Sequence, residues 1–263
     1  MDNAPQPIFP PEALAEIERA QQQALNAERT LREETYLNEA LLRTILHDLK
    51  NPLTVTMGNL QVIQMLSGST LSEKTLRLLG AAEEGCRSQL TIINNLSDLI
   101  KLDSGVLTYH PIPVDPLPIM KSQFQIFAKH DTQKTYTLPE CNETCLLMAE
   151  PDPFMRIIKN LLENCLRHTR NGGKIEATVT PEPSTGTMHI VIQDDGEVIP
   201  AKLLDLIFDR RFQVLTDHSG KRGDVGMGLV YARTAARAMG GSLKALECNT
   251  GAKFELILNL ALG

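Results

Sequence analysis

The sequence contains no tryptophan, and only 4% of its residues are aromatic. It has no stretch of about 20 apolar residues, which excludes a membrane-spanning helix within this chain, and its N-terminal sequence has no apolar core of signal-peptide length. Lysine and arginine form no basic block, and the net charge is -6. Because a surface that binds nucleic acid usually shows as a basic patch, we expect a cytoplasmic protein that has no nucleic acid as its main partner.

The five cysteines are widely scattered along the chain. The close pair, Cys141 and Cys145, has neither a second pair nor histidine partners at the spacing of a zinc site. Scattered cysteines of this kind are typical of reduced thiols in a cytosolic protein. With 263 residues, of which 42% are hydrophobic and 22% are charged, the chain has room for one large or two modest globular domains.

The N-terminal part is predicted to form two long helices. The first runs from the end of the proline-rich start to about Leu66, and only Pro52 interrupts its pattern. Such a helix of about 54 residues would measure roughly 80 Å, which is too long to fold back on a monomeric core. The second follows the turn "GSTLSEK", with a capping box of Thr70 and Glu73 at its start and Gly105 at its end. Two antiparallel helices with exposed apolar stripes predict a dimeric four-helix bundle.

Beyond the stretch "YHPIPVDPLP", which is expected to be a linker, helices and strands alternate. Amphipathic patterns predict helices over residues 119–129, 154–168 and 229–239. Alternating patterns predict strands in "TYTLPE", "CLLMAE", "KIEATVTPE", "MHIVIQDDG", "SLKALEC" and "AKFELILNL". The fold class is therefore α+β, an N-terminal helical hairpin followed by a domain with a mixed sheet.

The predicted helix over residues 154–168 carries apolar side chains on one face and Asn160, Asn164, Arg167 and His168 on the other. Asn160 and Asn164 are one turn apart. An amide oxygen is a neutral, hard ligand that suits Mg²⁺, and arginine donates hydrogen bonds to phosphates. The alternative interpretation is an ordinary solvated helix face.

Two further motifs follow in the same domain. The stretch "IVIQDDGEVIP" ends a strand with Asp194, and a buried carboxylate can accept from an adenine amino group but not from a guanine carbonyl. The stretch "GDVGMGLVYARTAARAMGG" places Gly226 and Gly228 before a helix, where the backbone can approach phosphates. Alone, these motifs are equally typical of a turn aspartate and a flexible loop. Their order in one domain argues against coincidence.

The stretch "HDLKNPLT" places His47 beside Asp48 in the first helix, five residues before Pro52. A neutral imidazole has a free nitrogen that can attack a phosphoryl group, and Asp48 can accept the hydrogen bond from the other ring nitrogen. Pro52 is expected to bend the helix just beyond this pair. The alternative is a surface histidine near a tolerated kink.

In this order, "HDLKNPLT", "NLLENCLRHT", "DDGEVIP" and "GDVGMGL" resemble the H, N, G1 and G2 boxes of the sensor histidine kinases of two-component systems. The resemblance covers about residues 40–263. It implies a dimerisation and histidine-phosphotransfer hairpin followed by an ATP-binding domain with the α/β-sandwich Bergerat (GHKL) fold. The expected domains are an N-terminal signalling helix at 1–40, a phosphotransfer domain at 41–108 and an ATP-binding domain at 109–263.

The resemblance also implies roles for individual residues. His47 would accept the phosphoryl group, with Asp48 beside it, and Asn51 would orient water on a phosphorylated partner. Asn164 would ligate Mg²⁺. The residues expected to bind ATP are Asn160, Asn164, Arg167, His168, Asp194, Gly196, Lys221, Arg222, Gly226 and Gly228. One departure from the family is Val198, which replaces the second glycine of the G1 box.

The implied function is an ATP-dependent protein-histidine kinase that acts as a homodimer. It would transfer the phosphoryl group from His47 to an aspartate on the receiver domain of a response regulator, and dephosphorylate that regulator. The alternative is a catalytically weakened scaffold or phosphotransfer module, in which Val198 and an altered lid impair ATP use. Residues 1–40 are too few for a sensor domain, so we expect the stimulus to come through the N-terminal helix, an upstream sensor protein or another part of a longer protein. No receiver is expected at the C-terminus.

Overall fold

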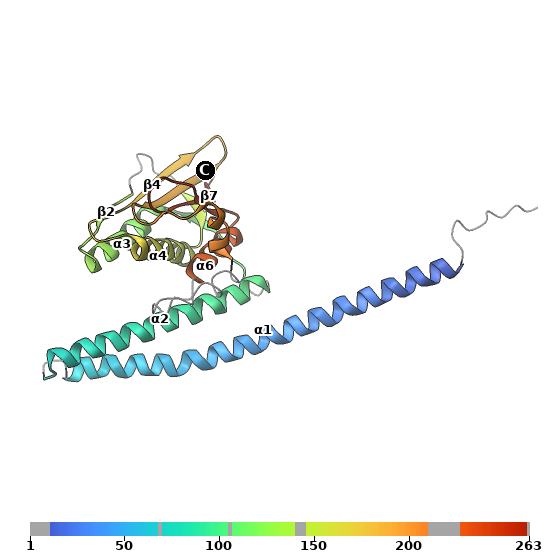
Figure 1. The fold of residues 1–263 in the computed structure, drawn as a ribbon, viewed down its shortest axis with the longest axis horizontal. Helices are drawn as coiled ribbons and strands as arrows, with labels where there is room; N and C mark the ends of the chain where they lie inside the picture. Colours follow the sequence, from blue (N-terminus) through green and yellow to red (C-terminus); the bar gives the residue numbers. More distant parts are fainter. Residues whose placement is uncertain (1–10, 68–69, 105–106, 140–145, 210–226, 262–263) are drawn as a thin grey trace, which may run out of the picture. The chain divides into compact units, whose positions relative to one another are not determined.

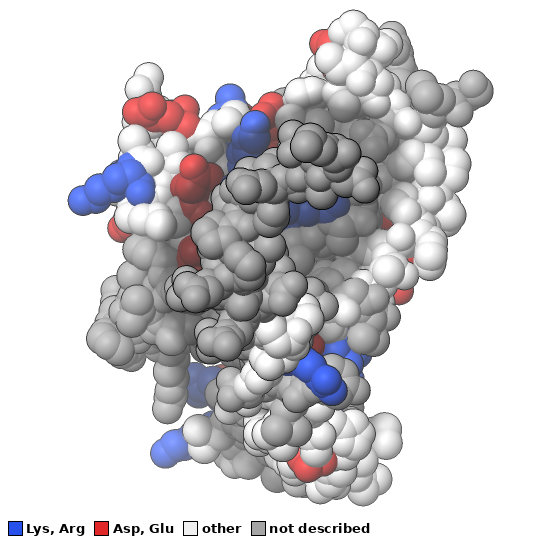
Figure 2. Space-filling view, turned by 90° about the vertical axis from the view of Figure 1, so that its right-hand side faces the viewer, with Lys and Arg blue, Asp and Glu red and all other residues white. Residues whose placement is uncertain are grey.

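The computed structural model describes residues 11–67, 70–104, 107–139, 146–209 and 227–261 (Figure 1). Its internal contacts divide the chain into two units, one that ends at Asn51 and one that begins at Pro52. The predicted site residues Lys221, Arg222 and Gly226 lie outside the described residues. Acidic and basic side chains are interspersed over the face shown in Figure 2. Within the described ranges, no helix combines the length and the apolar character needed to cross a membrane.

Helix α1 (Pro11–Ser67) is the long helix that the sequence predicts, and it continues through Pro52. The predicted bend at this proline stays a prediction. Helix α2 (Glu73–Asp103) runs antiparallel to the part of α1 that follows Pro52 (Figure 1). The side-chain amide of Gln61 on α1 donates to the carboxylate of Glu83 on α2 at 3.3 Å. These two segments therefore form the predicted helical hairpin.

The N-terminus of α2 differs from the prediction. Ser72 is the N-cap, with extended backbone angles, and its Oγ accepts a hydrogen bond from the backbone N–H of Thr75 at 3.2 Å. The capping box of Thr70 and Glu73 was therefore wrong. In a capping box the glutamate is the third helical residue, whereas here Glu73 is the first and Ser72 precedes it as the cap.

The second unit contains a five-stranded sheet with the strand order β2-β4-β5-β7-β6. Its strands are β2 (Thr135–Thr137), β4 (Lys174–Glu182), β5 (Thr187–Asp194), β6 (Ser242–Leu246) and β7 (Lys253–Asn259). Strand β2 pairs with β4 in parallel and all other pairs are antiparallel, so the sheet is mixed, as predicted. Two short strands, β1 (Ile112–Val114) and β3 (Leu147–Ala149), form a separate antiparallel pair.

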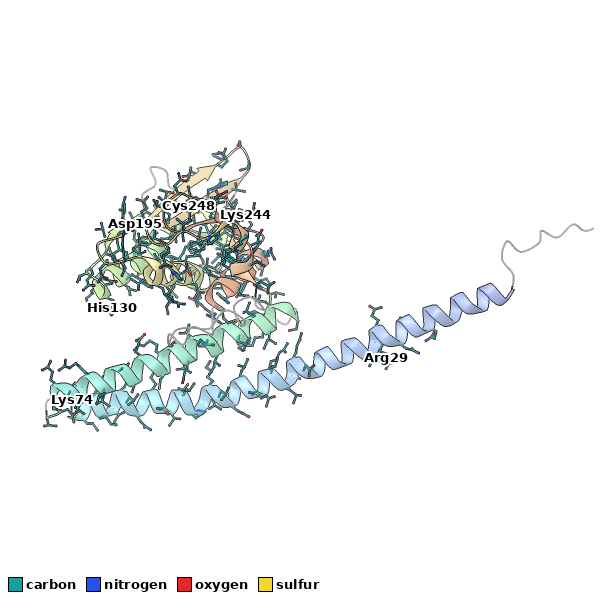
Figure 3. All side chains as sticks on the ribbon, in the orientation of Figure 1. Arg29, Lys74, His130, Asp195, Lys244 and Cys248 are labelled. Atoms are coloured by element: carbon teal, nitrogen blue, oxygen red, sulfur yellow. The ribbon has the colours of Figure 1, made fainter. Side chains whose placement is uncertain are left out.

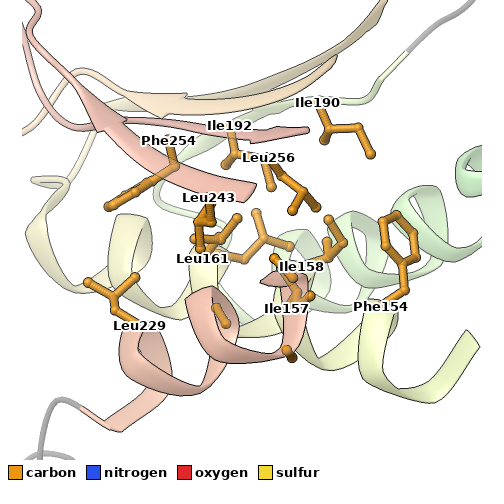
Figure 4. Close-up of a cluster of buried hydrophobic side chains, with 14 of the residues drawn as sticks. Phe154, Ile157, Ile158, Leu161, Ile190, Ile192, Leu229, Leu243, Phe254 and Leu256 are labelled. Carbon is orange, nitrogen blue, oxygen red and sulfur yellow. The ribbon is translucent and has the colours of Figure 1, made fainter. Parts of the chain in front are cut away.

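Three helices lie on one side of this sheet (Figure 1). They are α3 (Pro116–His130), α4 (Pro151–His168) and α6 (Met227–Ala238). Two single-turn 3-10 helices, η1 (Ala201–Leu203) and η2 (Leu206–Phe208), follow β5. The core forms between the sheet and the helices, where Ile157 and Leu161 of α4 meet Ile192 and Leu256 (Figure 4).

The proline-rich stretch before α3 is more ordered than a linker. Strand β1 lies within it, and α3 begins three residues before the predicted start at Ile119. The carboxylate of Asp115 caps α3 by accepting from the backbone N–H of Leu117 at 3.0 Å. Proline in the first turn costs no helical hydrogen bond, so Pro116 favours this start. The interpretation of the whole stretch as a linker was therefore wrong.

Candidate active site

A cavity of about 280 Å³ lies between α4, α6, α2 and the segment that follows β5. Half of the predicted ATP-binding residues line it, and they come from α4 and the start of α6. These residues are Asn160, Asn164, Arg167, His168 and Gly228. The fold thus brings the predicted N and G2 motifs together around one space.

The C-terminal half of α4 supplies the polar side of the cavity. Asn160 is only 7% exposed, although the sequence pattern placed it opposite the apolar face. Arg167 and His168 are exposed at the end of the helix, and the ring nitrogen Nδ1 of His168 lies 4.0 Å from a carboxylate oxygen of Glu197. The cavity therefore combines amide groups with cationic or ionisable groups, which is a suitable set for a phosphorylated ligand.

Two glycines allow the backbone to pass close to α4. A Cβ atom on Gly228 would lie 3.0 Å from Oδ1 of Asn160. A Cβ atom on Gly196 would lie 2.2 Å from the carbonyl oxygen of His168, a distance that no real side chain allows. Position 196 therefore needs glycine, although Gly196 itself does not line the cavity, whereas a side chain at position 228 would require Asn160 to shift.

Asp194 continues the inward-facing alternation of β5, in which Met188, Ile190 and Ile192 are buried. Its side chain is therefore carried to the helix-covered face of the sheet. Residue Asp194 is only 5% exposed, and burial raises the pKa of its carboxyl above the usual value. Asp194 does not line the cavity. Its hydrogen-bond partner Ala252 does.

The two carboxylate oxygens of Asp194 have different surroundings. Oδ1 accepts from the backbone N–H of Gly196 at 2.8 Å and from that of Ala252 at 3.3 Å. Oδ2 is buried and has no hydrogen-bond partner among the described residues. An unpaired buried acceptor costs free energy, so this oxygen is suited to an N–H donor from a ligand.

The neighbouring aspartate has a structural role. Oδ1 of Asp195, which is labelled in Figure 3, accepts from the backbone N–H of Lys174 at 2.8 Å. This hydrogen bond joins the end of β5 to the start of β4. The sequence "DD" alone does not show which carboxylate faces the core. The alternation of β5 decides it, because Asp194 follows Ile192 by two residues.

Other residues around the cavity were not predicted from the sequence. Gly251 has φ +67°, and a Cβ atom there would lie 1.9 Å from the carbonyl oxygen of Asp194. Its only sequence signal is its place in the turn between the last two strands. Thr91, Ile92 and Asn95 reach the cavity from α2, which no local pattern indicates.

The thiol of Cys165 is fully buried near Asp194. Burial raises its pKa well above the usual value, and the charge of Asp194 raises it further. This cysteine therefore stays a protonated thiol at neutral pH, and it is a packing residue rather than a nucleophile.

His47 lies in the first unit, on α1, and its side chain is 72% exposed. Its ring nitrogen Nδ1 lies 3.4 Å from Oδ1 of Asp48. With the proton on Nδ1 facing this carboxylate, Nε2 carries the lone pair. Asn51 is also exposed, one helical turn further along. Nε2 is therefore the ring nitrogen of His47 that does not face Asp48.

Two family models match the chain. Residues 37–105 match the His Kinase A (phospho-acceptor) domain, and residues 149–262 match the histidine kinase-, DNA gyrase B- and HSP90-like ATPase domain. The chain belongs to the histidine kinases. The phosphoacceptor model covers His47 and α2, including Thr91, Ile92 and Asn95, and the ATPase model covers the cavity walls from α4 onward.

Relatives of this histidine kinase chain include the Sensor protein TorS of Escherichia coli, which is 30% identical over 213 residues. That match covers 78% of this chain and 22% of TorS. Hybrid signal transduction histidine kinase D of Dictyostelium discoideum is 25% identical, over 93% of this chain and 16% of its own length. Histidine protein kinase SaeS of Staphylococcus aureus is 28% identical, over 75% of this chain and 56% of SaeS. The chain therefore spans only part of the length of these relatives.

Solved structures of histidine kinases share the fold. Full-length ShkA in complex with AMPPNP matches 84% of this kinase chain with a TM-score of 0.65 and 19% sequence identity. The match covers 46% of that ShkA chain. Acinetobacter baumannii histidine kinase AdeS matches 81% of this chain and 97% of its own, with a TM-score of 0.54 and 17% identity. At these identities the likeness concerns the fold alone.

Proposed function

We propose that this chain is an ATP-dependent protein-histidine kinase that autophosphorylates His47 and passes the phosphoryl group to an aspartate on the receiver domain of a response regulator. The observation that carries the proposal is the convergence of the polar face of α4 and the glycine at the start of α6 on one cavity. The exposed pair of His47 and Asp48 in the phosphoacceptor domain would supply the group that accepts the phosphoryl group.

The geometry of His47 supports the following transfer step. The lone pair on Nε2 forms a bond to the γ-phosphorus of ATP, while the bond from that phosphorus to the bridging oxygen breaks and ADP leaves. The ring gains positive charge as the new bond forms. Asp48, whose Oδ1 lies 3.4 Å from Nδ1, would stabilise that charge and could accept a proton from Nδ1.

The residues in and next to the cavity fit an adenine nucleotide. The free Oδ2 of Asp194 would accept from the exocyclic amino group of adenine, because a carboxylate only accepts hydrogen bonds. Arg167 and His168 would bind phosphates, with Asn160 beside them. Lys221 and Arg222, which the structure does not describe, would also contact the phosphates. Mg²⁺, held by the amide oxygen of Asn164, would neutralise phosphate charge. Gly196, Gly226 and Gly228 would let the backbone approach the nucleotide.

We assign the phosphotransfer domain to residues 41–108 and the ATP-binding domain to residues 109–263, with a signalling helix at 1–40. The family models, at 37–105 and 149–262, support this division. The chain would act as a homodimer in the cytoplasm, where ATP is available. Its input would come through α1 from an upstream sensor protein or segment. Nothing in the comparisons favours a catalytically weakened scaffold.

The test is incubation of the purified chain with γ-labelled ATP and Mg²⁺, in parallel with His47→Gln. We expect label that is stable to alkali, labile in acid and lost in His47→Gln. The matched control is His130→Gln, which removes an exposed histidine on α3 and should keep the label. Label that survives in His47→Gln would contradict the assignment of His47.

A second activity of the same site is dephosphorylation of the receiver domain. Asn51 lies one turn after His47 and is exposed, so its amide could orient water toward the aspartyl phosphate of a docked receiver. Asn51→Ala should slow the loss of label from a phosphorylated receiver and leave labelling of His47 intact. An unchanged rate of dephosphorylation would contradict this role.

A further inference from the structure

A polar junction joins α2 to the helices of the nucleotide-binding domain. Arg156, on α4, forms an ion pair with Asp98 of α2 and donates a hydrogen bond of 2.7 Å to Oδ1 of Asn95. Its guanidinium carbon also lies 4.0 Å from the centre of the Tyr231 ring on α6. We call these four residues the Arg156 junction. One side chain thus connects α2, α4 and α6.

The Arg156 junction is largely shielded from water. Asn95 is 5% exposed and Tyr231 is fully buried, while the side chains of Arg156 and Asp98 are 29% and 20% exposed. Shielding weakens the screening of an ion pair by salt, and the planar guanidinium can bind a carboxylate and an amide oxygen at the same time. Beside the junction, Leu99 of α2 is fully buried in the apolar cluster that includes the sheet core. The polar contacts of Arg156 and the burial of Leu99 therefore both hold α2 against the nucleotide-binding domain.

Helix α2 is also part of the cavity wall. Thr91, Ile92 and Asn95 line the cavity together with residues of α4 and α6, whereas Arg156 does not line it. Asn95 therefore belongs both to the wall and to the Arg156 junction. A change at Arg156 would therefore act on the cavity through the helices it joins, and α2 is the one that it holds by two polar contacts.

We propose that Arg156 is a positioning residue that docks α2 so that it completes the nucleotide pocket, and that nucleotide binding and α2 docking stabilise each other. The proposal rests on the nucleotide binding proposed above and adds a wall to that site from outside the ATPase domain. Coupling of this kind is reciprocal: if docking strengthens nucleotide binding, bound nucleotide strengthens docking by the same factor. Because α2 belongs to the phosphoacceptor domain, that domain would respond to the nucleotide state of the pocket.

The first measurement is the affinity of the full chain for AMPPNP with Mg²⁺, determined by calorimetry. Arg156→Gln removes the charge and should weaken binding about fivefold or more, although residue 156 does not line the cavity. The matched control is Arg87→Gln, because Arg87 pairs with Glu83 within α2 itself. It should keep the affinity of the unmodified chain.

A double-variant comparison distinguishes the junction from a general loss of structure. Asp98→Asn should also weaken binding, and the variant that carries both changes should be no weaker than Arg156→Gln alone, because both act on one contact. Additive losses would contradict a shared junction.

Hydrogen exchange gives a second readout. It distinguishes a positioning role of Arg156 from a purely structural one, because only the positioning role predicts that the protection of α2 depends on bound nucleotide. Bound AMPPNP should slow amide exchange in the α2 segment over residues 91–99 of the unmodified chain and of Arg87→Gln, but not of Arg156→Gln. Unmodified chain that binds AMPPNP without protection of this segment, or Arg156→Gln with full affinity and protection, would overturn the proposal. Absence of AMPPNP binding to the unmodified chain would instead contradict the proposed function.

Discussion

Asp194 lies where the needs of stability and of ligand binding oppose each other. The same alternation that buries Ile190 and Ile192 carries its carboxylate into the core side of the sheet. Two backbone N–H groups satisfy Oδ1, while Oδ2 remains buried without a partner among the described residues. This residue is therefore expected to cost stability in the free protein and to contribute binding free energy when a donor from adenine meets Oδ2.

The first prediction concerns Asp194→Asn. The amide can keep an oxygen toward Gly196 and Ala252, but it then presents an N–H donor to the adenine amino group. Nucleotide binding should weaken by about 2 kcal/mol, roughly thirtyfold, while the thermal unfolding temperature should not fall. The control is Asp195→Asn, since its amide oxygen can still accept from the backbone N–H of Lys174 and Asp195, unlike Asp194, is not buried. Calorimetry and thermal denaturation measure the two effects. Equal loss of affinity in both variants would contradict adenine recognition by Asp194.

The pH dependence of stability follows from the same residue. Burial raises the pKa of Asp194 in the folded state above its unfolded value. The stability contributed by this group is therefore present below the unfolded pKa and is lost as pH rises through the folded pKa. Asp194→Asn cannot titrate, so its unfolding temperature relative to the unmodified chain should rise between mildly acid and neutral pH. A constant difference across that range would contradict the raised pKa.

At the residue scale, the sequence predicts the proposed ligand-binding side chains better than it predicts the residues that surround and position them. Asn160, Asn164 and Asp194 follow from helical and strand periodicity, which is a local signal. Gly251, which no side chain could replace beside Asp194, and Asn95 of α2 were missed. Their roles depend on contacts with residues distant in the sequence.

At the scale of elements, the long periodic segments were predicted well because their burial pattern repeats many times. Helices α1, α2 and α4 and strands β4, β5 and β7 have the expected type and nearly the expected ends. The prediction failed at the proline-rich stretch before α3, where β1 forms only because it pairs with the distant β3. The parallel pairing of β2 with β4 likewise has no local signal.

The second prediction concerns the start of α2. Ser72→Ala removes the oxygen that accepts from the backbone N–H of Thr75 at 3.2 Å, which leaves a helix-terminal donor without its cap. We expect a loss of about 1 kcal/mol in the free energy of unfolding, which lowers the unfolding temperature by roughly 2–4 °C. Thr70→Ala should have a smaller effect, because Thr70 lies outside the cap. Thermal denaturation measures both losses. The same or a larger loss for Thr70→Ala would show that Thr70, and not Ser72, is the capping residue.

At the scale of the whole molecule, the exposed apolar side chains of the first unit point to a second copy of the chain. Leu41, Leu42, Ile45 and Leu49 lie on α1 close to His47 in sequence, and each is between 44% and 53% exposed. Residues 41, 45 and 49 repeat at one-turn spacing and form a continuous stripe. Because this segment matches a phosphoacceptor domain of the histidine kinases, we expect the helices of a second copy to bury the stripe.

The third prediction therefore concerns the homodimer. Ile45→Glu places a charge in the middle of the stripe, and burying it between helices would cost several kcal/mol. The dimer should dissociate at least about tenfold more readily, as measured by sedimentation. Lys244→Glu, a charge change on β6 of the sheet, should leave the dimer unchanged. A dimer of full stability in Ile45→Glu would show that the stripe is covered in another way.

The central claim, that nucleotide bound at the α4 and α6 cavity phosphorylates His47, is tested most directly by locating the phosphate. The chain should be incubated with ATP and Mg²⁺, digested under conditions that preserve phosphoramidates, and analysed by tandem mass spectrometry. The account predicts one phosphorylated peptide, with the modification on His47, which disappears when Asp194→Asn or Asn164→Ala weakens the nucleotide site. Phosphate on another residue, or an unmodified His47 in a chain that still binds ATP, would contradict it.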